Sequence, residues 1–166
     1  MSQPIVIEAR NLEKRFGTID AVRGIDLEVR KGEIFGFLGP NGAGKSTTIN
    51  ILCTLLKPTS GSAFVAGFDV ARQPNAVRQR LGLVFQDPSL DIQLTARENL
   101  EFHAFLYRVP KSARAARIFA VLEMVQLTDR AESLVMTYSG GMKRRLEIAR
   151  GMLHTPEVLF LDEPTI

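Results

Sequence analysis

The stretch "GPNGAGKST", residues 39–47, decides the fold of this chain. It matches the pattern G-x-x-x-x-G-K-[S/T] at every fixed position. The residues before it, "EIFGFL" (33–38), form a continuous apolar run that predicts a buried strand, and "KSTTINILCTLL" (45–56) carries the apolar stripe of a helix. A strand, a glycine-rich loop and a helix in this order predict an α/β domain with a phosphate-binding loop.

The loop offers three kinds of contact to a chain of phosphates. Its glycines let backbone N–H groups turn toward phosphate oxygens, and the helix that follows adds the positive end of its dipole. Lys45 brings a full charge to the β and γ phosphates, the Ser46 hydroxyl suits Mg²⁺, and Thr47 reaches an inner phosphate. The dinucleotide-binding pattern G-x-G-x-x-G is absent. The alternative is a glycine-rich turn that holds no ligand.

Other patterns predict the remaining elements. Strands are expected at 5–10, 25–30, 62–67, 81–85 and 157–164, and a short helix at 74–80. Residues 91–135 form a helical insert, with helices at 94–107 and 111–127, and a further helix covers 139–153. The first helix of the insert opens with Thr95 and Glu98 in the spacing of a capping box.

Two carboxylates, Asp162 and Glu163, end the apolar strand at 157–164. Acidic side chains at the carboxyl end of a strand face the crevice where α/β sheets bind ligands. Asp162 is therefore expected to hold Mg²⁺ through water, and Glu163 to orient or deprotonate an attacking water. The alternative is a pair of acidic turn residues before Pro164.

The helix start "YSGGMKRRLEIAR" (138–150) is energetically unusual. Each of its two glycines costs about 1 kcal/mol against alanine inside a helix, and three cations follow at the positive end of the helix dipole. Ser139 suits an N-cap, but Met142 at the third helical position completes no capping box, so the Ser139 hydroxyl is less committed to the backbone. The open N–H groups of Gly140 and Gly141 then indicate a second anion site.

The three cations of this helix start are Lys143, Arg144 and Arg145. Lys143 precedes Glu147 by four residues, which is the weaker order for a helical ion pair. The cations are therefore expected to add to a positive field at the second anion site. The alternative is a tolerated poor cap with a solvated basic face.

The composition is that of an ordinary globular domain. The chain has 166 residues, 45% hydrophobic and 23% charged, with a net charge of +3 that suits an anionic ligand but is too small to argue for a nucleic-acid partner. No apolar run approaches the roughly 18 residues that span a bilayer, and the N-terminus lacks a signal-peptide pattern. The single cysteine, Cys53, allows no internal disulfide and lies at core spacing.

In their order along the chain, the phosphate loop, "VFQD" (84–87), "YSGGMKRRLEIAR" and "VLFLDEPT" (158–165) resemble the ATP-binding subunit of an ABC transporter. The resemblance implies a P-loop NTPase fold of the α/β class, with a RecA-like parallel core sheet, a small antiparallel β subdomain and a helical subdomain at about 91–135. It implies that two such domains pair head to tail. Each ATP would lie between the phosphate loop of one chain and the Ser-Gly-Gly signature of the other.

The resemblance also assigns roles to single residues. Phe16 would stack on adenine, with a core phenylalanine as the alternative, and Val22 would line the same pocket. The residues expected on ATP are Phe16, Val22, Gly39, Pro40, Asn41, Gly42, Ala43, Gly44, Lys45, Ser46 and Thr47. Mg²⁺ would be held by Ser46, Gln86 and Asp162, and the catalytic residues would be Lys45, Gln86 and Glu163. The ATP of the partner chain would meet Ser139, Gly140, Gly141 and Met142. The alternative for Gln86 is an exposed loop glutamine.

Two departures favour a subfamily. Tyr138 stands where leucine is commonest, and Met142 where glutamine is commonest, as in ATPases similar to the daunorubicin-type multidrug and antibiotic exporters. This resemblance implies a membrane-spanning permease as partner and a place on the inner face of the cell membrane. Non-transport relatives stay open as alternatives: ribosome-associated, iron–sulfur assembly and DNA-repair ATPases. The DNA-repair ATPases would need long coiled coils, and no heptad repeat is present.

The chain stops at "DEPTI" (162–166), just after the Walker B strand. The family continues with an aspartate-bearing loop and a histidine that senses the γ-phosphate. His154 cannot replace that histidine, because it precedes the carboxylate strand at a helix end, where a cap role is expected. His103 lies in the helical insert without a metal partner, and a structural role is expected for it. We therefore expect an incomplete domain that is inactive alone. A missing neighbour strand would leave unpaired backbone groups and exposed apolar surface.

Overall fold

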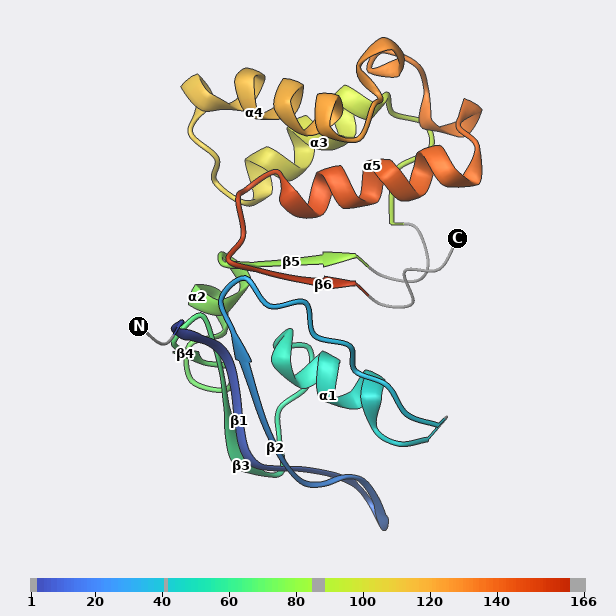
Figure 1. Cartoon of the computed structure of the whole chain (residues 1–166). Helices are drawn as coiled ribbons and strands as arrows, with labels where there is room; N and C mark the ends of the chain where they lie inside the picture. Colours follow the sequence, from blue (N-terminus) through green and yellow to red (C-terminus); the bar gives the residue numbers. More distant parts are fainter. Residues whose placement is uncertain (1–2, 41, 85–88, 162–166) are drawn as a thin grey trace. The chain divides into compact units, whose positions relative to one another are not determined.

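The computed structural model describes residues 3–40, 42–84 and 89–161. The chain forms two compact units, 1–81 and 82–166 (Figure 1). Asn41, Gln86, Asp162 and Glu163, which carry four of the predicted roles, lie outside the described residues. The extent of the domain over 1–166 and the helical subdomain at about 91–135 stay predictions.

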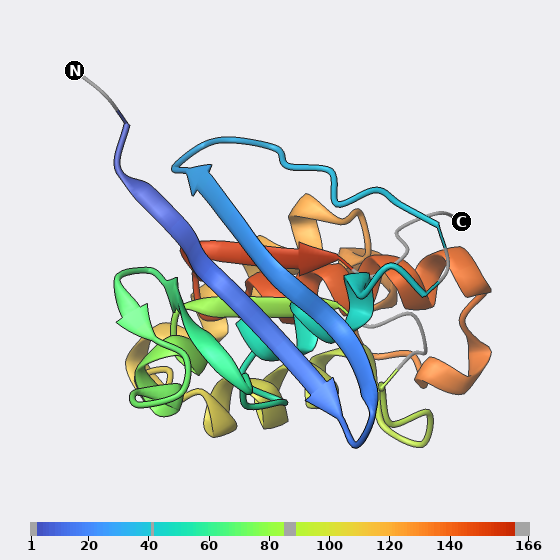
Figure 2. The same ribbon diagram turned by 90° about the horizontal axis from the view of Figure 1, so that it is seen from below.

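Unit 1 is built on an antiparallel sheet with the strand order β2-β1-β3-β4. The strands are β1 (Ile5–Phe16), β2 (Ile19–Arg30), β3 (Ser60–Val65) and β4 (Phe68–Asp69). β1 and β2 form a long hairpin whose last pair joins Phe16 to Ile19 (Figure 2). The strands predicted at 5–10, 25–30 and 62–67 are thus present. The first two are longer than expected because residues 12–16 of β1 pair with residues 19–25 of β2.

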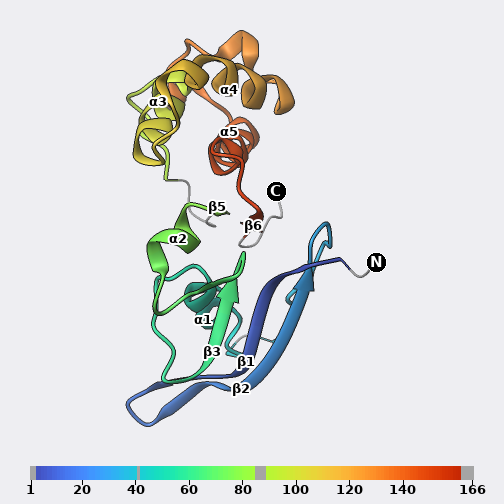
Figure 3. The same ribbon diagram turned by 90° about the vertical axis from the view of Figure 1, so that its left-hand side faces the viewer.

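One helix, α1 (Lys45–Leu52), packs against this sheet through β2 and β3 (Figure 3). It begins directly after the phosphate loop, as predicted, but ends four residues early. Thr54 has a left-handed φ of 64°, and the N–H groups of Leu55 and Leu56 both bond the carbonyl of Asn50, which closes the helix. Cys53 at this end is only 2% exposed, as expected for a core residue. The short helix predicted at 74–80 is α2 (Pro74–Arg78).

The prediction of a buried strand at 33–38 is wrong. This segment belongs to neither sheet of the described chain, and Ile34 and Leu38 are 100% and 93% exposed. An apolar run becomes a strand only when a neighbouring backbone supplies hydrogen bonds, and no described strand pairs with this one. The expected exposed apolar surface is therefore present at the segment that leads into the phosphate loop.

Unit 2 joins a two-stranded sheet to a layer of helices (Figure 1). β5 (Leu81–Val84) and β6 (Val158–Leu161) run side by side in the same direction. The helices are α3 (Ala96–Leu106), α4 (Lys111–Met124) and α5 (Gly140–Met152), with 3₁₀ turns η1 (Thr128–Arg130) and η2 (Val135–Thr137). All three predicted helices are present. Their apolar stripes meet in one core around Leu100, Ile118, Leu122 and Leu146.

α5 lies directly on the two strands, and glycines make this contact possible. A Cβ on Gly82 of β5 would lie 2.3 Å from the carbonyl oxygen of Gly151 in α5 and 2.8 Å from a methyl of Leu159 in β6. No side chain fits between these backbones. The glycine pair therefore fixes how deep α5 sits against the sheet of unit 2.

Candidate nucleotide-binding sites

The phosphate loop turns into α1 through a glycine that no other residue can replace without strain. Gly44, the N-cap of α1, has a left-handed φ of 83°. A Cβ at this position would lie 2.3 Å from the carbonyl oxygen of Ala21 and 3.4 Å from Cγ2 of Val22. The start of α1 therefore rests against β2 with backbone in contact with backbone. Val22, the predicted pocket residue, is buried at this contact.

Lys45 is folded back over the loop. Its Nζ donates to the carbonyl oxygens of Gly39 at 2.6 Å and Pro40 at 2.8 Å. The ammonium group thus lies at the mouth of the loop, where phosphate oxygens would offer it anionic acceptors in place of neutral carbonyls. Ser46, next in the first turn of α1, is exposed, so its hydroxyl fits a phosphate-bound Mg²⁺.

Phe16 lies at the end of β1 and is 45% exposed. The Nζ of Lys14 is 5.0 Å from the centroid of its ring. Phe16 is therefore not a core phenylalanine in unit 1, and its ring is partly exposed on the β1–β2 hairpin, whose strand β2 contacts the start of α1. Its predicted role as the adenine-stacking ring stays a prediction.

The signature helix begins as an open helix end. Ser139 is the N-cap of α5, and its Oγ accepts from the Met142 N–H at a long 3.3 Å. A Cβ on either Gly140 or Gly141 would meet no atom within 4 Å. The Ser139 hydroxyl is thus more committed to the backbone than the sequence suggested, while the first N–H groups of α5 stand clear of side chains.

Arg145 is expected from the sequence to add positive charge at the start of α5, but its guanidinium is bound elsewhere. Its Nη1 donates to the carbonyl oxygen of Val125 at 2.9 Å, at the carboxyl end of α4, where a cation is favoured by the helix dipole. The buried carboxylate of Glu147 accepts from Arg150 and from the N–H of Ser89. Ser89 and Val125 lie 58 and 20 residues from the α5 side chains that contact them, so no local pattern predicts these two contacts.

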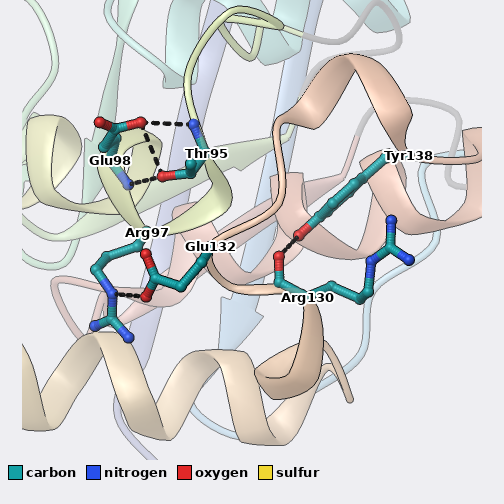
Figure 4. A network of polar contacts seen from close by, with 6 residues as sticks. All are labelled: Thr95, Arg97, Glu98, Arg130, Glu132 and Tyr138. Atoms are coloured by element: carbon teal, nitrogen blue, oxygen red, sulfur yellow. Dashed lines mark hydrogen bonds and ion pairs between the residues drawn. The ribbon is translucent and has the colours of Figure 1, made fainter.

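Tyr138 holds the residue before the signature serine in place (Figure 4). Its ring is buried, and its hydroxyl donates to the carbonyl oxygen of Arg130 at 2.6 Å. Burial raises the pKa of Tyr138, while the nearby Arg130 charge opposes the shift. The leucine more common at this position could not make this hydrogen bond. Tyr138 therefore fixes the start of α5 to turn η1.

Figure 4 also shows polar contacts at the start of α3 and between α3 and the segment that carries η1 and η2. Thr95 and Glu98 form the predicted capping box of α3, with the Thr95 N–H donating to the Glu98 carboxylate at 2.7 Å. Arg97 pairs with Glu132 at 2.5 Å across 35 residues. The backbone of the η turns thus lies against the start of α3.

A pocket of about 220 Å³ lies beside these contacts in unit 2. Leu94, Phe102 and Leu106 give it an apolar side, and Phe102 and Leu106 are exposed. Ser89, Asp91, Asn99, His103 and Arg150 supply the polar side. Sequence reasoning did not find this pocket, because its walls come from three segments that are distant in the chain.

The imidazole of His103 is part of a ring cluster. Its centroid lies 4.3 Å from that of Tyr107, which in turn lies 4.0 Å from that of His154. Burial lowers the pKa of His103 to about 3, and the charges of Arg150 and His154 act in the same direction. Among the residues that the structure describes, no group of three or more His, Cys, Asp or Glu could hold a metal ion. The rings of both histidines contact Tyr107, and for His103 this agrees with the expected structural role.

His103 predicts a loss of stability in mild acid. The folded pKa of His103, about 3, lies below the ordinary value of 6.5. Between these two pH values the imidazole is protonated in the unfolded chain and neutral in the folded chain. The contribution of His103 to stability is complete above its unfolded pKa and falls by about 1.4 kcal/mol per pH unit below it. Between pH 7.5 and 5.0, His103→Phe should lose about 2 kcal/mol less than wild type in urea unfolding. Equal losses in the two proteins would contradict the prediction.

The chain is similar to known ATP-binding proteins over nearly its whole length. A family model described as "ABC transporter" matches residues 22–166. The daunorubicin resistance ATP-binding protein DrrA2 of Streptomyces coeruleorubidus is 48% identical over 159 residues, which cover 96% of this chain and 49% of that protein. The linearmycin resistance ATP-binding protein LnrL of Bacillus subtilis (strain 168) is 42% identical over 161 residues, 97% of this chain and 52% of that protein. The chain spans about half the length of these curated relatives.

A solved structure shares the fold. A dimeric ATP-binding cassette in a post-hydrolysis state, bound to ADP and Pi, aligns with a TM-score of 0.81 and 31% identity over 96% of this chain and 74% of that chain. The similarity confirms the predicted α/β fold of the P-loop NTPase type. The described part of the chain contains no helix with the length and apolar character needed to cross a membrane.

Proposed function

The chain belongs to the ABC transporter family, and on that basis we propose that it binds and hydrolyses ATP as part of a transport subunit. The observation that carries the proposal is the phosphate loop, with Gly44 pressed against β2 and the Lys45 ammonium over the loop carbonyls. A glycine-rich turn without a ligand would have no need of a buried backbone contact and a lysine held at its mouth. The alternative in which the loop is only a turn is therefore disfavoured.

Catalysis would combine positioning with electrostatics, as in phosphoryl transfer generally. Lys45 and the N–H groups at the start of α1 would neutralise the β and γ phosphates. The exposed Ser46 hydroxyl, with Gln86 and a water held by Asp162, would bind Mg²⁺, which when bound offsets phosphate charge. Glu163 would orient or deprotonate the attacking water.

Each ATP would be completed by a second copy or a related chain in head-to-tail contact. The open N–H groups of Gly140 and Gly141, capped by Ser139, favour an anion at the start of α5. A phosphate loop and an open Ser-Gly-Gly start in one chain are explained if they serve different nucleotides. The relative solved as a dimer with ADP and Pi supports this arrangement.

The transported compound is proposed to be a drug or another hydrophobic compound that leaves the cell. The support comes from relatives named for daunorubicin and linearmycin resistance. The subunit would work on the inner face of the cell membrane, with the apolar side of the unit 2 pocket, Phe102 and Leu106, against a membrane-spanning permease. The net charge of +3 gives no support for a nucleic-acid partner.

The test uses the subunit that carries these residues, purified with and without its permease. We expect saturable binding of a fluorescent ATP analogue and Mg²⁺-dependent release of phosphate. Glu163→Gln should keep the binding and lose the release. Absence of binding in wild type, or normal turnover in Glu163→Gln, would refute the proposal. Cells that express both subunits should tolerate more daunorubicin than cells that express a Lys45→Ala pair.

A further inference from the structure

α5 contains a buried ion pair that the proposed catalysis does not use. Glu147 is fully buried, and its Oε2 accepts from Nη2 of Arg150 at 2.7 Å. The Arg150 side chain is only 15% exposed. A buried ion pair is weak evidence for stability, because the loss of hydration of both charges opposes their attraction. A role other than stability is therefore considered for the pair.

Both members of the pair bind Ser89. The N–H of Ser89 donates to Oε1 of Glu147 at 2.6 Å, and Nη1 of Arg150 donates to the Ser89 carbonyl oxygen at 2.8 Å. Nη2 of Arg150 also donates to Oγ of Ser89. All three polar groups of Ser89 are thus bound by residues one turn apart on α5. Such complete use of one residue's hydrogen-bonding groups fixes its position and its orientation.

The same segment is held a second time, from α3. Asn99 is buried, and its side-chain amide pairs with both backbone groups of Asp91. Oδ1 of Asn99 accepts from the Asp91 N–H at 2.9 Å, and Nδ2 donates to the Asp91 carbonyl oxygen at 2.9 Å. Ser89 and Asp91 both line the pocket of unit 2. Its polar side is therefore attached to α3 and α5 through hydrogen bonds that include the buried side chains of Asn99 and Glu147.

The signature lies at the other end of the same helix. A helix rises about 1.5 Å per residue, so Glu147 lies roughly 12 Å along α5 from Ser139. We propose that Glu147 and Arg150 are positioning residues that make the pocket segment and the signature helix move as one body. A permease segment in the pocket would then set the orientation of Ser139 toward the ATP of the partner chain. The inference rests on the proposed function and adds the residues that connect the two sites.

The test replaces the ion pair without leaving a lone buried charge. Glu147→Leu combined with Arg150→Met keeps similar volume, and such replacements commonly preserve folding. The subunit is assayed with its permease in lipid vesicles for basal ATPase activity, permease-dependent and daunorubicin-stimulated ATPase activity, ATP affinity and melting temperature. We expect ATP affinity within twofold of wild type and a melting temperature within a few degrees. The stimulated component should fall at least tenfold.

Ser89→Ala is the matched control. It removes the hydroxyl contact and leaves the two backbone bonds, so more than half of the stimulated component should remain. If the double variant does not fold, Glu147→Gln decides, since it keeps an acceptor for the Ser89 N–H and removes the charge. Its stimulated component should fall at least threefold at unchanged ATP affinity.

The outcomes separate the two ideas. Full stimulation in the folded double variant, or in Glu147→Gln when that variant decides, would overturn the inference and leave the proposed function intact. Failure of wild type to bind ATP would overturn both.

Discussion

Replacing Lys45 with alanine is expected to weaken ATP binding about 10- to 100-fold. The Lys45 ammonium is the charged group at the mouth of the loop, held by the carbonyl oxygens of Gly39 and Pro40. A hydrogen bond to a charged group contributes about 1.5–3 kcal/mol, and each 1.4 kcal/mol changes affinity about tenfold. Titration of a fluorescent ATP analogue measures the loss, and ATP hydrolysis should fall with it.

The control for Lys45→Ala is Lys31→Ala. Lys31 is an exposed lysine of the same unit, in the turn after β2, so its removal changes net charge equally. Its affinity for ATP should stay within twofold of wild type. The melting temperature of Lys45→Ala should stay close to that of wild type, because the lost contacts are exposed ones. Equal ATP affinities of Lys45→Ala and wild type would contradict the role given to the loop.

Gly140→Asp is expected to lower ATP turnover at least 100-fold while leaving the fold intact. A side chain at this position meets open space, and a carboxylate in the first turn of α5 is favoured by the helix dipole. The same carboxylate would face the phosphates of the partner's ATP. Two like charges about 4 Å apart repel by roughly 4 kcal/mol in a medium of dielectric constant about 20.

Gly140→Ala provides the matched comparison. It adds the Cβ without charge and should leave the free energy of unfolding unchanged or up to about 1 kcal/mol higher. Its turnover should exceed that of Gly140→Asp by at least tenfold. Affinity for ATP at low occupancy should be the same in both variants, since both keep the phosphate loop unchanged. Normal turnover in Gly140→Asp would refute the signature as a phosphate site.

The features that sequence predicted well are those set by residues near one another in the chain. The start of α1 at Lys45, the Thr95–Glu98 capping box and the Ser139 N-cap of α5 all depend on spacings of one to four residues. Local rules for capping and backbone conformation decide such features. The sequence therefore located both helix starts on which the proposed function depends.

What the sequence missed depends on partners far along the chain. The segment 33–38 has the composition of a buried strand, but strand formation needs a neighbouring backbone. Glu147 has Lys143 at helical spacing, yet its buried carboxylate binds Ser89, 58 residues away. Arg145 likewise caps α4 across 20 residues. Tertiary packing overrides the local pairings in these cases.

Because Cys53 is buried, cysteines introduced at the surface can be labelled site-specifically. Cys53 is the only cysteine of the chain, and maleimide reagents reach exposed thiols far faster than thiols inside a core. A cysteine introduced at Lys31 or Lys143 would thus be labelled by a fluorophore or spin label far faster than Cys53, so Cys53 need not be removed first. Distances between such labels on two chains could then follow assembly and separation in real time.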